Sequence, residues 1–262
     1  MIANDPLWDI ICTEARQIAS QEPLMSEFFD AAILSHESLA QALCFNLSQQ
    51  LHSSVMSAAA IAEVLAEAMG SDGAICDAAR TDIHACFDRD PACDNHFMPI
   101  LYFKGFQALQ LHRVAHWLWL QGRNHLALYL QSQISEVFAV DIHPGAQIGS
   151  GIMIDHASGL VIGETAIVGN DVSILHSVTL GGSGCIKGSR HPTIGNGVMI
   201  SAGAKILGNV VVGDGVKIGA GSLVLESVPA HVTVAGVPAK IVGAPREAAP
   251  ALEMDQYLSD RP

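Results

Sequence analysis

The chain has 262 residues, half of them hydrophobic, so a sizeable core and one or two domains are expected. Its formal net charge is −13, most of it from the sixteen acidic and six basic side chains of residues 1–139, and this excess excludes nucleic acid as a partner. The chain has no signal-peptide pattern, no apolar run long enough to span a membrane and no C-x-x-C spacing among its six cysteines. These features predict a cytoplasmic protein with reduced thiols and no membrane partner.

The first half of the chain has the pattern of a series of helices. Residues 5–20 and 24–50 are predicted as helical, and apolar residues at helical spacing predict another helix that ends at Gly70. Ser71 or Asp72 can cap the next helix, which runs toward Phe87. A long helix is predicted from Pro99 to Gly122, and a last one from Asn124 to residue 138. We therefore predict an all-helical domain over residues 1–139.

From residue 142 onward the period of the sequence changes to six. Each hexad carries one aliphatic residue, and a glycine often follows it directly. This pattern is typical of a parallel β-helix, in which every hexad forms a short strand and a corner of a triangular coil. The predicted fold is α+β in two parts: the helical domain, then a left-handed β-helix over residues 140–245 and a flexible tail over 246–262. The thirteen aliphatic positions are Ile142, Ile148, Ile154, Ile162, Val168, Ile174, Leu180, Ile194, Ile200, Ile206, Val212, Ile218 and Val224.

Two breaks interrupt this period. Ile154 and Ile162 are eight residues apart, and fourteen residues separate Leu180 from Ile194, which is two more than two hexads. Breaks in a repeat array usually form loops on one side, where functional residues gather. The first break contains Asp155-His156 and the second contains Arg190-His191.

The polar residues at the breaks have the chemistry of a small-molecule site. His156 can act as a general base near neutral pH, and Asp141 can hold its imidazole in one tautomer, although fifteen residues separate them and one coil has eighteen. Asp90 and Asp155 can bind an ammonium group, and Arg190 can bind a carboxylate through two hydrogen bonds. Each residue taken alone also fits an ordinary surface loop; their joint position at the breaks favours a site.

Several motifs together resemble one known family. The run VDIHPGAQIGSGIMIDHASGLVIGET is followed by DVSILHSVTLGGSG, SRHPTIGNGVMISAGAKILGN and AGVPAKIVG. These motifs, with DPAC and YFKGFQALQLHRVAHWLWLQGR upstream, resemble those of the serine O-acetyltransferases. These enzymes are hexapeptide-repeat acyltransferases of cysteine biosynthesis. The resemblance covers at least residues 80–245.

The resemblance implies that acetyl-CoA and L-serine react to give O-acetyl-L-serine and CoA. His156 is then the base that takes the proton of the serine hydroxyl, and Asp141 orients it. The resemblance further implies substrate binding by Asp90, Asp155, Arg190 and His191. It implies acetyl-CoA binding between subunits near Gly182, Ala202 and Lys217, with no acyl-enzyme, no metal and no permanently bound cofactor.

The resemblance also implies several partners. The family forms trimers or dimers of trimers, and L-cysteine inhibits it at the serine site. Many members end in a tail with a terminal isoleucine that binds O-acetylserine sulfhydrylase. This chain ends at Pro262 instead, so the sequence argues against a complex with O-acetylserine sulfhydrylase.

Three other functions have to be weighed against this one. Trimeric β-helix carbonic anhydrases bind zinc through three histidines, for which His143, His156 and His176 are candidates. A non-catalytic scaffold leaves the polar residues of both breaks unexplained. A sugar acetyltransferase is disfavoured by Asp90, which belongs to the helical half.

Overall fold

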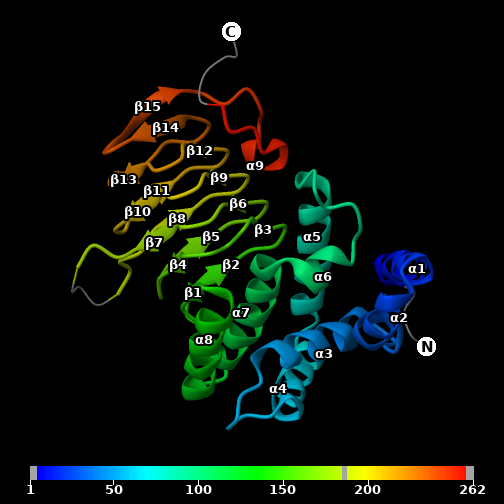
Figure 1. Cartoon of the computed structure of the whole chain (residues 1–262). Helices are drawn as coiled ribbons and strands as arrows, with labels where there is room; N and C mark the ends of the chain where they lie inside the picture. Colours follow the sequence, from blue (N-terminus) through cyan, green and yellow to red (C-terminus); the bar gives the residue numbers. More distant parts are fainter. Residues whose placement is uncertain (1–4, 185–187, 258–262) are drawn as a thin grey trace.

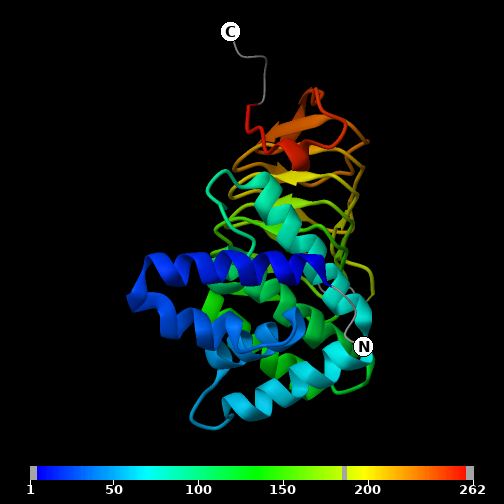
Figure 2. The same ribbon diagram turned by 90° about the vertical axis from the view of Figure 1, so that its right-hand side faces the viewer.

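The computed structural model describes residues 5–184 and 188–257. Helices form one end of the molecule, and a prism of short strands rises from them (Figures 1 and 2). The change occurs between Phe138, the last residue of α8, and Val140, the first of β1. Ala139 between them has a left-handed backbone, with φ of 56°, which ends the helix and turns the chain into the first coil. The predicted fold class is confirmed.

The helical part consists of eight α-helices in the described residues before the solenoid. A 3₁₀ turn (Pro23–Met25) precedes α2, and a π-helical turn (Asp30–Leu34) follows it. No helix in the described ranges is long and apolar enough to cross a membrane. The helices are α1 (Pro6–Gln21), α2 (Ser26–Phe29), α3 (Leu39–Leu51), α4 (Ala58–Ser71), α5 (Gly73–Arg89), α6 (Met98–Tyr102), α7 (Lys104–Leu120) and α8 (Asn124–Phe138).

The helical prediction differs from the structure in three places. The predicted helical stretch 24–50 is interrupted at residues 35–38, before α3 begins at Leu39. The predicted helix from Pro99 to Gly122 is wrong, because Phe103 has an extended backbone and separates α6 from α7. Gly70 does not end α4; the helix continues by one residue, and Asp72 then closes α4 and accepts a hydrogen bond from Ala74 N (3.0 Å) at the start of α5. The break at Phe103 lies where α7 begins against Ile154 of the solenoid, a contact that a local pattern does not encode.

The solenoid has three parallel sheets, one for each side of the prism. The first sheet contains β1 (Val140–Ile142), β4 (Leu160–Ile162), β7 (Thr179–Gly181), β10 (Lys205–Leu207) and β13 (Leu223–Val224). The second contains β2 (Gln147–Ile148), β5 (Ile167–Val168), β8 (Thr193–Ile194) and β11 (Val211–Val212). The third contains β3 (Met153–Ile154), β6 (Ser173–Ile174), β9 (Met199–Ile200), β12 (Lys217–Ile218) and β14 (Thr233–Gly236), with β15 (Ala239–Gly243) pairing antiparallel at its end.

The periodic aliphatic residues form the core of this prism. In the first sheet Ile142, Ile162 and Leu180 are register partners in successive coils. Ile148 is partly buried, and the other twelve residues are at most 6% exposed. Each coil thus stacks its aliphatic residues on those of the next, as the hexad pattern predicts.

The corners of the prism carry the two breaks. Corner 1, between the first and second sheets, comprises residues 143–146, 163–166, 182–192 and 208–210; corner 3, between the third and first, comprises 155–159, 175–178, 201–204 and 219–222. The first break adds two residues to corner 3. The second break is not two hexads plus two residues. Because β7 and β8 are on successive sides of the prism, it is one hexad lengthened by eight residues at corner 1. Residues 185–187 of that loop lie outside the described ranges.

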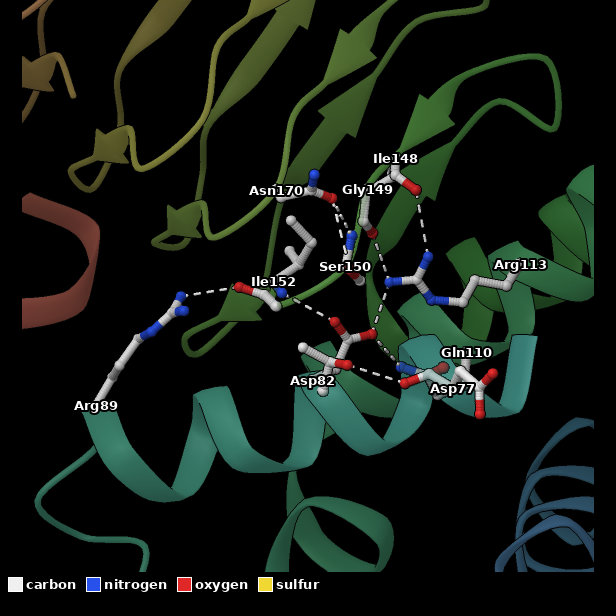
Figure 3. A network of polar contacts seen from close by, with 12 residues as sticks. Asp77, Asp82, Arg89, Gln110, Arg113, Ile148, Gly149, Ser150, Ile152 and Asn170 are labelled. Atoms are coloured by element: carbon white, nitrogen blue, oxygen red, sulfur yellow. Dashed lines mark hydrogen bonds and ion pairs between the residues drawn. The ribbon is translucent and has the colours of Figure 1, made fainter. Parts of the chain in front are cut away.

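A buried ionic network joins the helices to the first coil (Figure 3). Asp82 on α5 is fully buried and accepts hydrogen bonds from Arg113 Nη2 (2.7 Å), Gln110 Nε2 (2.9 Å) and Ile152 N (2.9 Å). Arg113 also donates to the carbonyl oxygens of Ile148 and Gly149. Backbone groups at the open end of the solenoid are therefore satisfied by side chains of α5 and α7.

The C-terminal segment covers the outer face of the third sheet. Residues 246–257 belong to the predicted flexible tail, but helix α9 (Pro250–Glu253) packs there with Ala251 fully buried. Ser173 Oγ donates to Ala251 O (2.8 Å), and Arg89 Nη1 donates to Ser173 Oγ (3.2 Å). These contacts fix the described part of the segment beside α5, as Figure 1 shows. Residues 258–262, and with them Pro262, lie outside the described residues.

His112 on α7 makes the fold sensitive to acid. Burial lowers the pKa of His112 to about 3, and its Nδ1 has no hydrogen-bond partner in the described part of the chain. The unfolded chain binds a proton near pH 6.5 and the folded chain does not, so stability is lost as the pH falls below 6.5. We expect this residue to cost about 1.4 kcal/mol of unfolding free energy between pH 7.5 and 5.5.

Urea unfolding at pH 7.5 and 5.5 measures this effect. His112→Gln should lose less stability than the wild-type chain between the two pH values, by about the amount given above. His125→Gln is the matched control, because His125 is exposed and should leave the pH dependence unchanged. Equal pH dependence in the wild-type chain and His112→Gln would contradict the prediction.

Candidate active site

A cavity of about 480 Å³ lies where the ends of α5, α6 and β3 meet the start of α7 at corner 3. Asp90, which follows α5 directly, contributes one side of it. Asp155 and His156 contribute another, and Lys104 and Ser158 line it as well. The structure therefore brings together three of the residues that the sequence predicts for the site, from parts of the chain more than sixty positions apart.

His156 presents its imidazole to solvent at the edge of this cavity. Its side chain is 75% exposed, and its Nε2 lies 3.7 Å from Asp155 Oδ1. The ring also meets that of His176 edge to face, with 5.9 Å between centroids. An accessible imidazole next to a carboxylate can accept a proton from a bound hydroxyl and release it again.

The backbone at His156 is strained. His156 and Ala157 both have φ of 56°, a left-handed conformation that costs a residue with a side chain about 1–2 kcal/mol. Gly159, which also has a positive φ, packs over Ser177, the left-handed residue of the same corner one coil further on. Gly159 is therefore the regular corner residue of its coil, and His156 and Ala157 belong to the two-residue break. The break thus adds a short left-handed turn to corner 3 and places His156 on its outer surface.

Asp141 does not contact His156 in this chain. It lies on β1 beside Val161 of β4, and its Oδ1 accepts a hydrogen bond from Gln131 Nε2 of α8 (2.7 Å). The carboxylate nearest the His156 ring is that of Asp155. Nothing in the sequence marked Gln131, since it has the ordinary appearance of a polar helical residue. The orienting role of Asp141 stays a prediction.

Arg190 and His191 lie at corner 1, the opposite end of the first sheet from His156. Arg190 Nη2 contacts Glu164 Oε2 at 2.5 Å, and this hydrogen bond lowers the pKa of the Glu164 carboxyl. The strands β4 and β7, which run from corner 3 to corner 1, have three residues each and span about 10 Å at 3.3 Å per residue. The sheet therefore separates Arg190 and His191 from the cavity of the same chain.

The ring of His191 is held in one tautomer. Thr165 N donates to its Nδ1 (3.2 Å), so in the neutral ring the hydrogen is on Nε2. Burial, and after it the charge of Arg190, lowers the pKa of His191, which favours the neutral form. The Nε2 edge packs against Gly163, where a Cβ atom would lie 2.0 Å away, so only glycine leaves room for the ring. His191 is thereby prepared to donate one hydrogen bond.

The residues predicted to bind acetyl-CoA are distributed over the prism. Gly182 lies at corner 1 beside His191, and Ala202 lies at corner 3. Lys217, on the third sheet, is almost fully buried and donates to the carbonyl oxygen of Tyr257. A contact between Lys217 and a co-substrate requires residues 255–257 to move.

The three histidines of the zinc alternative do not form one cluster in this chain. His156 and His176 are neighbours at corner 3, but His143 lies at corner 1, where its Nδ1 accepts from Gly145 N (3.0 Å). Within the described ranges, no group of three or more His, Cys, Asp or Glu side chains could hold a metal ion.

Comparison with known proteins identifies the family of the chain. The family "Serine acetyltransferase, N-terminal" matches residues 7–111, and "Bacterial transferase hexapeptide (six repeats)" matches residues 191–226. Serine acetyltransferase of Escherichia coli (strain K12) is 55% identical over 253 residues, which are 97% of this chain and 93% of that protein. The crystal structure of serine acetyltransferase from Vibrio cholerae superposes with a TM-score of 0.95 at 56% identity, covering 96% of this chain and 97% of the other.

Three similar solved structures contain ligands. A Neisseria gonorrhoeae serine acetyltransferase in complex with serine is 51% identical (TM-score 0.87, 91% of this chain and 98% of the other). A further solved serine acetyltransferase, in complex with cysteine, is 51% identical, with a TM-score of 0.94 and coverage of 96% of this chain and 98% of the other. The Brucella abortus enzyme in complex with coenzyme A is 49% identical (TM-score 0.89, 92% and 96%). Two matching families, near-complete coverage and more than half of the residues in common lead to one conclusion: this chain belongs to the serine acetyltransferase family.

Proposed function

We propose that His156 is the general base for transfer of the acetyl group from acetyl-CoA to the hydroxyl of L-serine. The observation that carries this assignment is the exposed imidazole of His156 on the wall of a cavity that also contains Asp90 and Asp155. Family membership supplies the reaction, and the cavity supplies the residues for it.

The chemistry is a direct transfer. His156 takes the proton of the serine hydroxyl while its oxygen attacks the thioester carbonyl carbon, which forms the new C–O bond. When the C–S bond breaks, the imidazolium returns the proton to the sulfur of CoA. One proton moves from serine to CoA by way of His156, and no acyl-enzyme forms.

Substrate binding uses both signs of charge. Asp90 and Asp155 bind the ammonium group of serine from two sides of the cavity, because both carboxylates line it. Arg190 and His191 bind the carboxylate or the developing oxyanion, for which the Nε2–H of His191 is suited. The relatives solved with serine and with cysteine support a site that takes both amino acids, so L-cysteine acts as an inhibitor of this chain.

A complete site requires a second copy of the chain. Arg190 and His191 lie at corner 1 and His156 at corner 3, so corner 1 of one copy has to approach corner 3 of its neighbour. Val161, Ile167 and Val211 are exposed apolar residues of the first and second sheets, the two sides that meet at corner 1. They support packing between copies in a trimer or a dimer of trimers.

Acetyl-CoA binds in the groove between two such copies. Gly182 and Ala202 offer backbone groups at corners 1 and 3, the two corners that approach each other, and Lys217 becomes available when the C-terminal segment moves. The coenzyme A complex of the Brucella abortus relative supports the co-substrate.

Release of free thiol from acetyl-CoA tests the proposed reaction. We expect the protein to release CoA rapidly with L-serine and far more slowly with sugars, and L-cysteine at millimolar concentration to raise the KM for L-serine without lowering kcat. A rate with L-serine no higher than hydrolysis of acetyl-CoA alone would refute the assignment. Competition with acetyl-CoA alone would move cysteine away from the serine site.

A further inference from the structure

We propose that Lys104 is a positioning residue that holds the left-handed turn carrying His156 in place through a hydrogen bond to Ser158. The proposal rests on the function of His156 given above. Both residues lie inside motifs of the sequence, in YFKGF and in DHASG, but neither was a candidate for the site; the structure brings them together across the cavity, from the first turn of α7 and from corner 3.

The turn has main-chain support on its solenoid side. Gly159 N donates to Ala139 O (2.8 Å), and Ser177 N donates to Ser158 O (2.8 Å). Ala157, the second residue of the turn, is completely buried. These contacts fix the end of the turn that leads into β4, while the His156 end projects toward the helices.

The first turn of α7 lies directly against the strand that precedes the turn. A Cβ atom on Gly105 would be 2.1 Å from Ile154 O, so only glycine allows this approach. Lys104, the residue before it, thereby reaches across, and its Nζ donates to Ser158 Oγ. This hydrogen bond joins the helical side of the cavity to the turn at Ser158, two residues after His156.

Lys104 is unfavourable for the helix on which it lies. It is the first residue of α7, where the helix dipole repels a cation, and the first turn contains no acidic residue to compensate. A local cost of this kind points to a role outside the helix.

Lys104 acts on the turn through the hydroxyl and not through a carboxylate. Asp90 and Asp155 line the same cavity, yet within the described residues no salt bridge of 4.0 Å or less joins Lys104 to either of them. Its Nζ is committed to Ser158. Loss of this contact leaves the His156 end of a strained turn free to shift, and a shift of about 1 Å at a reacting group is enough to lower the rate strongly.

Four variants test the role of this contact. Lys104→Met keeps the apolar stem and removes the donor, and Ser158→Ala removes the acceptor but keeps the cation. We expect each to lower kcat with L-serine about 10- to 100-fold with KM for acetyl-CoA unchanged. The double variant Lys104→Met/Ser158→Ala should be no slower than either single one, and Lys104→Arg should recover most of the rate.

Three kinetic outcomes overturn the proposal: an unchanged kcat in Lys104→Met, a slow Lys104→Met with a normal Ser158→Ala, or losses that multiply in the double variant. The second of these would show that Lys104 acts by its charge. Hydrogen exchange of the peptide covering residues 153–160 tests the contact independently of activity. Faster exchange in both single variants supports it, and unchanged exchange overturns it even if the wild-type protein proves to use another substrate.

Discussion

Replacing His156 by alanine is expected to lower kcat with L-serine by about 10²- to 10⁴-fold, the usual contribution of a general base. Thiol release from acetyl-CoA measures the rate. The thermal midpoint and the size of the assembly should not decrease, because the side chain is 75% exposed and makes no hydrogen bond to the core. Its removal also costs no packing energy in the core, because this exposed side chain is not part of it.

His176→Ala is the matched control. His176 lies beside His156 at the same corner, one coil further on, and its ring contacts that of His156. It does not line the cavity, so we expect its removal to change kcat only a few-fold. A His156→Ala enzyme that retains wild-type turnover would refute the mechanism, and a larger loss in His176→Ala than in His156→Ala would transfer the base to His176.

The second large effect is expected at Asp82, on the stability of the chain. Burial raises the pKa of the Asp82 carboxyl, and Arg113 and the N–H donors around it oppose this cost. Asp82→Ala leaves the nearly buried guanidinium of Arg113 without its counter-ion and Ile152 N without an acceptor. We expect a loss of about 3–5 kcal/mol of unfolding free energy, measured by urea denaturation.

Comparison with other charge pairs makes this prediction specific. Glu67→Ala breaks the exposed pair between Glu67 and Arg123 (2.7 Å) and should cost less than about 1 kcal/mol. The double variant Asp82→Ala/Arg113→Met removes both buried charges and should be more stable than Asp82→Ala alone. If Asp82→Ala does not fold, Asp82→Asn, which keeps one acceptor, gives the measurable loss. A cost for Asp82→Ala as small as that of Glu67→Ala would contradict the structure.

Much of the fold could be predicted because one repeated physical requirement determines it. Every coil needs an aliphatic residue on each side, so the positions from Ile142 to Val224 report burial directly. The same regularity led to the candidate residues Asp155 and His156, since an interruption of the period requires a loop. Asp155, His156 and Asp90 line one cavity at corner 3, an arrangement that the spacing of the repeat alone could not establish.

What could not be predicted depends on contacts between distant segments. The break at Phe103 exists because α7 has to begin where Gly105 meets Ile154. Asp141 turns to Gln131 of α8, a partner that no periodic pattern marks. Residues 246–257 look flexible in composition, but Ser173 and Lys217 on the third sheet provide partners for their carbonyl groups. Each of these outcomes follows from tertiary packing that overrides local preference.

The strained turn at corner 3 has an evolutionary consequence. Because it consists of two added residues between strands that return to register, deleting His156 and Ala157 together would restore the six-residue period and remove two left-handed side chains. Selection for stability alone would favour that shorter chain. The two added residues are therefore kept in this chain for what they place on the wall of the cavity and not for stability.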